Sequence, residues 1–234
     1  MTRAVCFDVD FTLIHPGPTF RGEGYQQFCA RYGIGVDPSR FEAAVAAASA
    51  VLDEARAHIY EPALFHRYTA AIITGMGGEG PQVDACAREI YDEWAGCHHF
   101  ELYEDVPATL REIAARGIRL GLISNSHRCL ASFGSHFELD GLISAAVSSS
   151  EHGYMKPHPS IFDAALRLLD VRAADAVMVG DSLRHDIEGA VQVGMRGVLV
   201  RRSAGIGPGG VSSAAAVGPD VPVIRSLTEL PALL

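Results

Sequence analysis

An apolar run that ends in two aspartates, near the start of the chain, sets the strongest limit on the fold. Residues 4–7 (Ala-Val-Cys-Phe) predict a buried strand of a parallel sheet. Asp8 and Asp10 follow two positions apart, so in extended backbone their side chains point to the same side. Open α/β sheets bind their ligands at the carboxyl ends of the strands. Two carboxylates held so close repel each other, and we therefore expect a proton or a cation such as Mg²⁺ beside them.

The composition limits the possible partners. A chain of 234 residues can form one large domain, or a core with a smaller second domain. Its formal charge of −9 argues against a nucleic acid or an anionic membrane as the partner. An anionic substrate would therefore need local positive charge, from a metal ion or from a well-placed lysine or arginine.

The cysteines and the apolar runs indicate a cytoplasmic protein. The five cysteines are scattered without zinc-type spacing, which is typical of reduced thiols in the cytosol. Only four apolar residues separate Arg3 from Asp8, so we expect no signal peptide. The apolar runs are all shorter than a membrane span.

Periodicity divides the chain into two kinds of segment. Four helices are predicted over residues 20–32, 38–58, 62–74 and 81–97, with loops over 13–19 and 98–105 at their two ends. From residue 106 strands and helices alternate, which predicts a parallel sheet with crossover helices. The expected fold class is α/β. We place a core domain over 1–15 and 100–234, and a helical domain over 16–99.

In the second half, strands are predicted over 118–123, 141–147, 176–179, 197–200 and 221–224. Helices are predicted over 107–116, 159–169, 186–193 and 227–233, with a further helix after residue 126. Residues 151–158 and the Gly-, Ser- and Ala-rich residues 201–219 are predicted as loops.

Two later segments carry groups that suit a phosphate. Ser124 and Asn125 follow a strand, where a hydroxyl and backbone amides can bind a phosphoryl oxygen; the alternative is a Ser N-cap for the next helix. Lys156 is the only lysine of the chain and precedes a helix that starts with proline. Its compact ammonium suits a phosphoryl oxygen, although a lone loop lysine is usually solvated.

A third segment supplies more carboxylates. Asp181 ends a predicted buried strand and should reach the same edge of the sheet as Asp8. Mg²⁺ prefers oxygen ligands, which the carboxylates of Asp8 and Asp181 would supply at this edge. Asp186 opens the next helix. It is expected to orient a metal-bound water or Lys156, or to serve the helix dipole, and these roles are compatible.

Together these segments resemble, in order, the four motifs of the haloacid dehalogenase-like (HAD) hydrolase superfamily. The motifs are Asp-x-Asp-x-Thr at 8–12, a Ser at 124, Lys-Pro at 156–157 and Gly-Asp-x(4)-Asp at 180–186. The resemblance covers the whole chain, because the helical segment lies where the family places its cap, and it looks like a C1 cap. It implies a Rossmann-like core with a parallel sheet and a helical cap that selects the substrate, although the cap offers no readable specificity code.

The resemblance also implies roles. Asp8 would be the nucleophile and a Mg²⁺ ligand, and Asp10 the general acid/base with its backbone carbonyl on the metal. Phosphate would be bound by Thr12, Ser124, Asn125 and Lys156, and the metal also by Asp181, with Asp186 supporting. Phe11 departs from the family pattern, which usually has Gly there, and puts the geometry of that turn in question.

The function expected from this resemblance is hydrolysis of a small phosphorylated metabolite by a Mg²⁺-dependent phosphatase, a monomer or homodimer, of the phosphoglycolate phosphatase or phosphoglucomutase-like branch. Asp10 suits phosphatases and phosphomutases, since the dehalogenase and phosphonatase branches lack that acid. A phosphomutase is the nearest alternative. A receiver-like or non-catalytic phosphate-binding protein is the alternative from another class.

Overall fold

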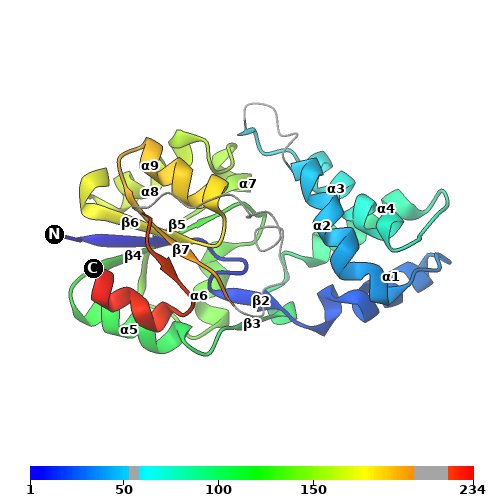
Figure 1. Cartoon of the computed structure of the whole chain (residues 1–234), viewed down its shortest axis with the longest axis horizontal. Coiled ribbons are helices and arrows are strands. Elements are labelled where there is room, and N and C mark those ends of the chain that lie inside the picture. Colours follow the sequence, from blue (N-terminus) through cyan, green and yellow to red (C-terminus); the bar gives the residue numbers. More distant parts are fainter. Residues whose placement is uncertain (53–57, 203–220) are drawn as a thin grey trace.

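The centre of this computed structural model, which describes residues 1–52, 58–202 and 221–234, is a six-stranded sheet. Neighbouring strands are parallel throughout, in the order β5-β4-β1-β6-β7-β8 (Figure 1). These strands are β1 (Ala4–Phe7), β4 (Arg119–Ser124), β5 (Ile143–Ser148), β6 (Ala176–Gly180), β7 (Arg196–Val200) and β8 (Val223–Ile224). The predicted α/β class with a parallel sheet is confirmed.

Strand β1 lies at the middle of this sheet, with Phe7 opposite Leu122 on β4 and Val179 on β6. All four of its residues are fully buried, because helices cover both faces of the sheet. Alternate side chains enter two separate hydrophobic clusters, one containing Phe7 and the other containing Cys6. This position delivers the residues after Phe7 to the centre of the carboxyl edge.

Helices lie on both sides of the sheet in Figure 1. The cluster that contains Phe7 also contains residues of α5, α6 and the 3-10 helix η7. The cluster that contains Cys6 also contains residues of α8 and α9. The bounds are α5 (Val106–Ala115), α6 (Leu130–His136), α8 (Pro159–Leu169), α9 (Gly189–Gln192) and η7 (Leu227–Leu233).

The four predicted helices between the first two core strands are present and lie together at one end of the molecule (Figure 1). They are α1 (Gly22–Arg31), α2 (Phe41–Leu52), α3 (Pro62–Gly75) and α4 (Val83–Glu93). Short 3-10 turns η1 (Pro18–Phe20) and η2 (Pro38–Arg40) precede α1 and α2. The last part of the helix predicted over 38–58 includes residues 53–57, which lie outside the described residues. The division into a core and a cap domain stays a prediction.

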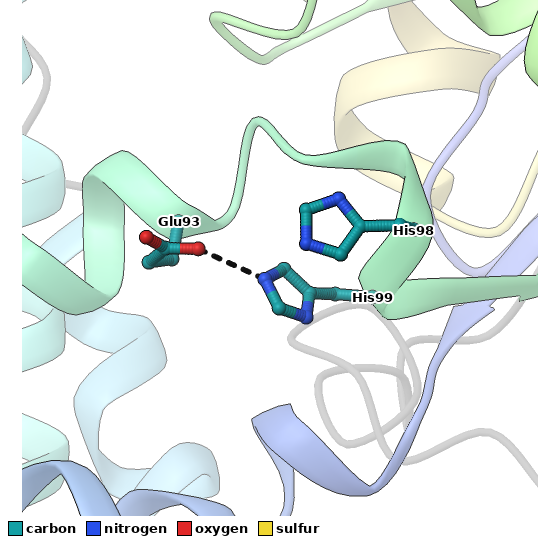
Figure 2. Close-up of side chains that lie close together, drawn as sticks. All are labelled: Glu93, His98 and His99. Carbon is teal, nitrogen blue, oxygen red and sulfur yellow. Dashed lines mark hydrogen bonds and ion pairs between the residues drawn. The ribbon is translucent and has the colours of Figure 1, made fainter.

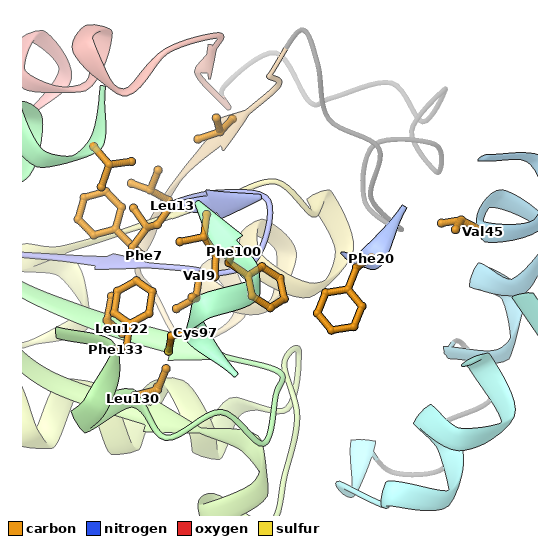
Figure 3. Packing of buried hydrophobic residues seen from close by; sticks show 14 of the residues in the cluster. Phe7, Val9, Leu13, Phe20, Val45, Cys97, Phe100, Leu122, Leu130 and Phe133 are labelled. Atoms are coloured by element: carbon orange, nitrogen blue, oxygen red, sulfur yellow. The ribbon is translucent and has the colours of Figure 1, made fainter. Parts of the chain in front are cut away.

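The two linkers that join these helices to the sheet differ from the predicted loops. Residues of β2 (Ile14–Pro16) pair antiparallel with β3 (Phe100–Leu102), directly after the 3-10 turn η4 (Cys97–His99). Such short strands leave no periodic signal, because the pairing joins segments that are far apart in sequence. One hydrophobic cluster runs from Phe7 past Val9 and Phe100 to Phe20, as Figure 3 shows, and it also includes Val45 on α2. Each linker therefore contributes residues to the buried core, among them Ile14 and Phe100.

Smaller differences occur near the carboxyl edge. The predicted loop 151–158 begins within a short helix, α7 (Ser149–His152). The predicted helix 186–193 starts earlier, as the π-helical turn η6 (Leu183–Glu188), before α9. The 3-10 turn η5 (Ala173–Asp175) precedes β6. The loop predicted over 201–219 falls almost entirely outside the described residues. In the described part of the chain, the helices lack the length and apolar content that a membrane span requires.

Candidate active site

Asp8 directly follows β1, and both of its carboxylate oxygens are held. Oδ1 accepts a hydrogen bond from Lys156 Nζ at 2.6 Å, and Oδ2 accepts one from Thr12 Oγ1 at 3.0 Å. Thr12 reaches back to Asp8 because the chain turns tightly between them. Phe11 in this turn has a φ of +65°, a left-handed conformation that glycine adopts without steric cost. The turn itself is thus formed with Phe11 in place of the family's usual glycine.

Lys156 connects two of the predicted site carboxylates. It is buried, and its ammonium also donates to Asp186 Oδ1 at 2.6 Å. Asn125 fixes the lysine loop: its side-chain amide donates to the Lys156 carbonyl at 3.0 Å, and its Oδ1 accepts from the Lys156 backbone N–H at 2.7 Å. The Asn125 side chain therefore fixes the lysine loop, and the contact with phosphate expected at this position stays a prediction.

Asp186 and Asp181 arrive from the end of β6. Asp186 Oδ2 accepts a hydrogen bond from the backbone N–H of Ser182 at 3.0 Å. A Cβ on Gly180 would collide with the Asp186 carboxylate, so this approach requires glycine at position 180. Among the roles expected for Asp186, the hydrogen bond from Lys156 Nζ corresponds to the orientation of Lys156. Asp8, Asp181 and Asp186 each offer an oxygen within 4.8 Å of the other two.

The electrostatics of this group reflect burial and crowding. Burial raises the pKa of Asp8 to about 7. The ammonium of Lys156 lowers this pKa, whereas the negative charges of Asp186 and Asp10 raise it further. The pKa of Asp181 is raised well above its ordinary value, by burial and then by Asp8 and Asp186. Burial alone would lower the pKa of Lys156, but Asp186 and Asp8 outweigh it and raise the pKa. Three carboxylates against one ammonium leave excess negative charge.

The three-carboxylate cluster fits a Mg²⁺ ion. Its donors are all oxygens, which Mg²⁺ prefers, and its excess negative charge favours a divalent cation. Asp8 and Asp181 would hold the ion, while Asp186 already holds Lys156. Two of the predicted ligands, Asp8 and Asp181, belong to this group, and the backbone carbonyl of Asp10 as a further ligand stays a prediction.

Asp10 is paired with Arg128, a residue that the sequence analysis missed. Arg128 Nη1 donates to both carboxylate oxygens of Asp10, at 2.9 and 3.2 Å, and Nη2 donates to the carbonyl of Trp94 at 2.9 Å. Its guanidinium carbon lies 4.3 Å from the ring centroid of Phe100. The side chain is fully buried. Arg128 thus joins the predicted acid/base to the end of α4 and to β3.

The position of Arg128 in the sequence was one sign that it belongs to the site. It stands four residues after Ser124, in the same strand-end loop, but an arginine in a polar loop usually indicates a solvated charge. Ser124 itself is buried, and its hydroxyl lies 2.8 Å from that of Ser126. Helix α6 begins at Leu130 with Cys129 as its N-cap, so Ser124 does not cap that helix.

A comparison with models of protein families shows which family the chain belongs to. The model for haloacid dehalogenase-like hydrolases matches residues 2–194. The chain belongs to the haloacid dehalogenase-like hydrolase family. The family resemblance predicted from the four motifs is thereby confirmed.

Relatives of this HAD-like hydrolase carry different names. Haloacid dehalogenase-like hydrolase domain-containing protein 3 of Danio rerio is 31% identical over 155 residues, covering 65% of this chain and 60% of that protein. Pyrophosphatase PpaX of Bacillus cereus (strain G9842) is 34% identical over 114 residues, covering 47% of this chain and 52% of that protein. The chain thus spans between half and two thirds of the length of these two relatives.

A solved structure is similar over the whole chain. The crystal structure of 2-haloacid dehalogenase from Pseudomonas syringae pv. Tomato DC3000 has a TM-score of 0.64 and 27% sequence identity. The similarity covers 100% of this chain and 98% of that one. Names of relatives therefore include a pyrophosphatase and a dehalogenase, and membership of the family alone does not separate these chemistries.

A cavity of about 1000 Å³ lies over the site residues of this HAD-like hydrolase. One end is lined by Asp8, Asp10, Lys156 and Asp181. The part that the helical segment contributes is largely aromatic, and its lining includes Tyr25, Phe41, Tyr60, Phe65, Tyr68, Tyr91 and Trp94. His127 also lines it and stacks on Tyr91 at a centroid distance of 4.0 Å. The cavity therefore combines a charged end with an end rich in aromatic side chains.

Proposed function

We propose that this HAD-like hydrolase is a Mg²⁺-dependent phosphomonoester hydrolase that forms an aspartyl-phosphate at Asp8. Its substrate is a small phosphorylated metabolite. The observation that carries the proposal is the convergence of Asp8, Lys156 and Asp181 at one sheet edge, with Asp10 two positions further on and held by Arg128. Buried carboxylates around one ammonium suit attack on an anionic phosphoryl group once a cation is present.

In the first step a carboxylate oxygen of Asp8 attacks phosphorus. The new O–P bond forms as the ester P–O bond breaks, and the leaving oxygen takes a proton from Asp10. Lys156, whose Nζ is 2.6 Å from Asp8, is placed to neutralise a phosphoryl oxygen, and the Ser124 hydroxyl is the second polar group for this charge. Mg²⁺, when bound by Asp8 and Asp181, supplies further positive charge for the phosphoryl oxygens.

In the second step water clears the intermediate. Asp10 takes a proton from water, the water oxygen bonds to phosphorus, and the bond between phosphorus and Asp8 breaks. Inorganic phosphate leaves, and both carboxylates return to their starting state. Arg128 keeps Asp10 in one place for both proton transfers, since it binds both carboxylate oxygens.

The aromatic end of the cavity supports one class of leaving group. Tyr60, Phe65 and Tyr91 form adjacent ring contacts there, with centroid distances of 5.5 and 5.8 Å to Phe65. Such a surface binds apolar or planar groups, whereas a purely polyhydroxylated or dianionic group gains little from it. We propose that the leaving group of the substrate carries an apolar or aromatic portion.

A panel assay of phosphate release tests this function. The panel contains a nucleoside monophosphate, an aryl phosphate, sugar phosphates, phosphoglycolate and inorganic pyrophosphate, with a 2-haloacid scored by halide release. We expect Mg²⁺-dependent release from monoesters, fastest for those with an aromatic or apolar leaving group, and no release by Asp8→Asn. Halide release as the main activity would overturn the proposal.

A specific observation favours one second candidate, hydrolysis of a phosphoanhydride. The relative named pyrophosphatase PpaX is 34% identical to about half of this chain. Pyrophosphate lacks an apolar group, so the aromatic end of the cavity counts against it. Pyrophosphate turnover that exceeds all monoesters in the same panel would establish this candidate.

A further inference from the structure

A second group of metal-ligating side chains lies away from the acidic cluster. Glu93 is the last residue of α4, and His98 and His99 belong to the turn η4 that leads into β3. Each side chain offers one ligand atom, and these atoms all lie within 4.8 Å of one another. Figure 2 shows the two imidazoles beside each other, with the Glu93 carboxylate directed toward His99.

The turn between α4 and β3 holds these donors in place. His99 Nε2 and Glu93 Oε2 are 2.9 Å apart, and the His99 ring packs edge-on against Phe20 at a centroid distance of 5.2 Å. Gly96 donates its N–H to the Glu93 carbonyl at 3.0 Å. A Cβ on Gly96 would lie 2.8 Å from Cε1 of His98, so the glycine lets this ring lie close to the turn. The three donors are thus preorganised by a run of seven consecutive residues, 93–99.

The chemistry of the donors differs from that of the acidic cluster. Two imidazole nitrogens and one carboxylate oxygen suit Zn²⁺ and other borderline divalent ions, whereas Mg²⁺ prefers oxygen donors and keeps its waters. Three protein ligands leave a fourth position of a tetrahedral ion for water. The side chain of Glu93 is 46% exposed, so an ion can enter from solvent without local unfolding.

We propose that Glu93, His98 and His99 bind one Zn²⁺-class ion, at a site separate from the catalytic metal. The ion would fasten the end of α4 to the linker before β3. His99 also accepts a hydrogen bond through its carbonyl from the N–H of Gly17 at 2.8 Å, in the opposite linker. A bound ion would therefore stabilise the linkers that join the helices to the sheet. The competing explanation is an ordinary ion pair between Glu93 and His99, in which His98 has no part.

Calorimetric titration of the untagged full chain with Zn²⁺ tests the site. The protein is first stripped with a chelator, and Mg²⁺ is kept in large excess to occupy the all-oxygen cluster. We expect one saturable equivalent. His98→Ala and Glu93→Gln should each weaken it by at least ~10-fold, since changes even to residues behind the ligands cost that much. His136→Ala, which removes another histidine at the end of a helix, is the matched control and should bind as the wild type.

The outcomes separate the explanations. Binding weakened in the two cluster variants, and unchanged in both His136→Ala and Asp181→Ala, supports the site. Wild-type affinity in His98→Ala indicates the plain ion pair and overturns the proposal. Absence of saturable binding, or equal losses in His136→Ala, also overturns it. Titration with Co²⁺, whose visible spectrum reports imidazole ligation, gives a second readout that is independent of phosphate release.

Discussion

Replacement of Arg128 by methionine tests how strongly the proposed mechanism depends on a fixed Asp10. The change removes two hydrogen bonds to Asp10 and one to the Trp94 carbonyl, and keeps apolar volume beside Phe100. Hydrogen bonds to charged groups contribute about 1.5–3 kcal/mol. If that amount is lost from the transition state, kcat falls about 10- to 150-fold. The Asp10 side chain is 18% exposed, so water replaces part of the loss, and we expect the lower part of this range.

The assay compares two substrates, because proton delivery by Asp10 matters more for a poor leaving group. We expect Arg128→Met to slow an alkyl phosphate more than p-nitrophenyl phosphate, with KM little changed for both. Arg128→Lys keeps the charge but cannot bind Asp10 and the Trp94 carbonyl through two planar nitrogens, and should recover only part of the rate. Arg111→Met, on the exposed side of α5, is the matched control and should be neutral.

A stability measurement separates a loss of rate from a general loss of folding. The bare Trp94 carbonyl should cost about 1–3 kcal/mol of unfolding free energy, which urea titration measures. Equal slowing of both substrates would show that Arg128 acts through the fold and not through Asp10. Wild-type kcat with both substrates would refute the positioning argument outright.

The remaining predictions concern the carboxylates. Asp8→Asn should abolish turnover of an aryl phosphate without changing the circular dichroism spectrum, and a near wild-type rate would remove Asp8 as nucleophile. Asp10→Asn should give a presteady-state burst of nitrophenol followed by slow turnover, but no burst from an alkyl phosphate; equal slowing without a burst would contradict the acid/base role. Asp181→Asn should shift the Mg²⁺ activation curve to higher concentration, and an unchanged curve would contradict metal ligation. Because folding raises the pKa of Asp181, its ionised form opposes folding as the pH rises above the ordinary aspartate range. In Mg²⁺-free buffer Asp181→Asn should therefore have the same Tm as the wild type at acidic pH and a higher Tm at alkaline pH. Equal Tm values at both pH values would show that ionised Asp181 does not destabilise the folded protein.

The centre of the fold could be predicted because its signals are local. The run before Asp8 is apolar at every position, and such a run in a parallel sheet must be covered on both faces. Lys156 was placed by its resemblance to a motif, since nothing in its own loop requires burial. Phe11 was noticed as a departure from the family pattern, but only backbone geometry showed that it adopts the left-handed turn.

The parts that could not be predicted depend on contacts between distant segments. Arg128 is 118 positions from Asp10 and 34 from Trp94, so no sequence window contains its partners. The side chain of Asn125 bonds to the backbone of Lys156, 31 positions away, and its place after a strand gives no sign of that partner. Pairing of residues 14–16 with 100–102 was missed for the same reason. Periodicity reports which face of an element is buried, but it does not report what covers that face.

The single lysine has a consequence for chemical labelling. Lys156 is the only lysine in the sequence, and it is 2% exposed between two carboxylates. Amine-directed modification, such as reductive methylation or acetylation, therefore finds no accessible lysine side chain within this sequence. A lysine label would be incorporated only when Lys156 leaves Asp8 and Asp186. The mass of one peptide, followed over time, would then measure how often Lys156 leaves the candidate active site.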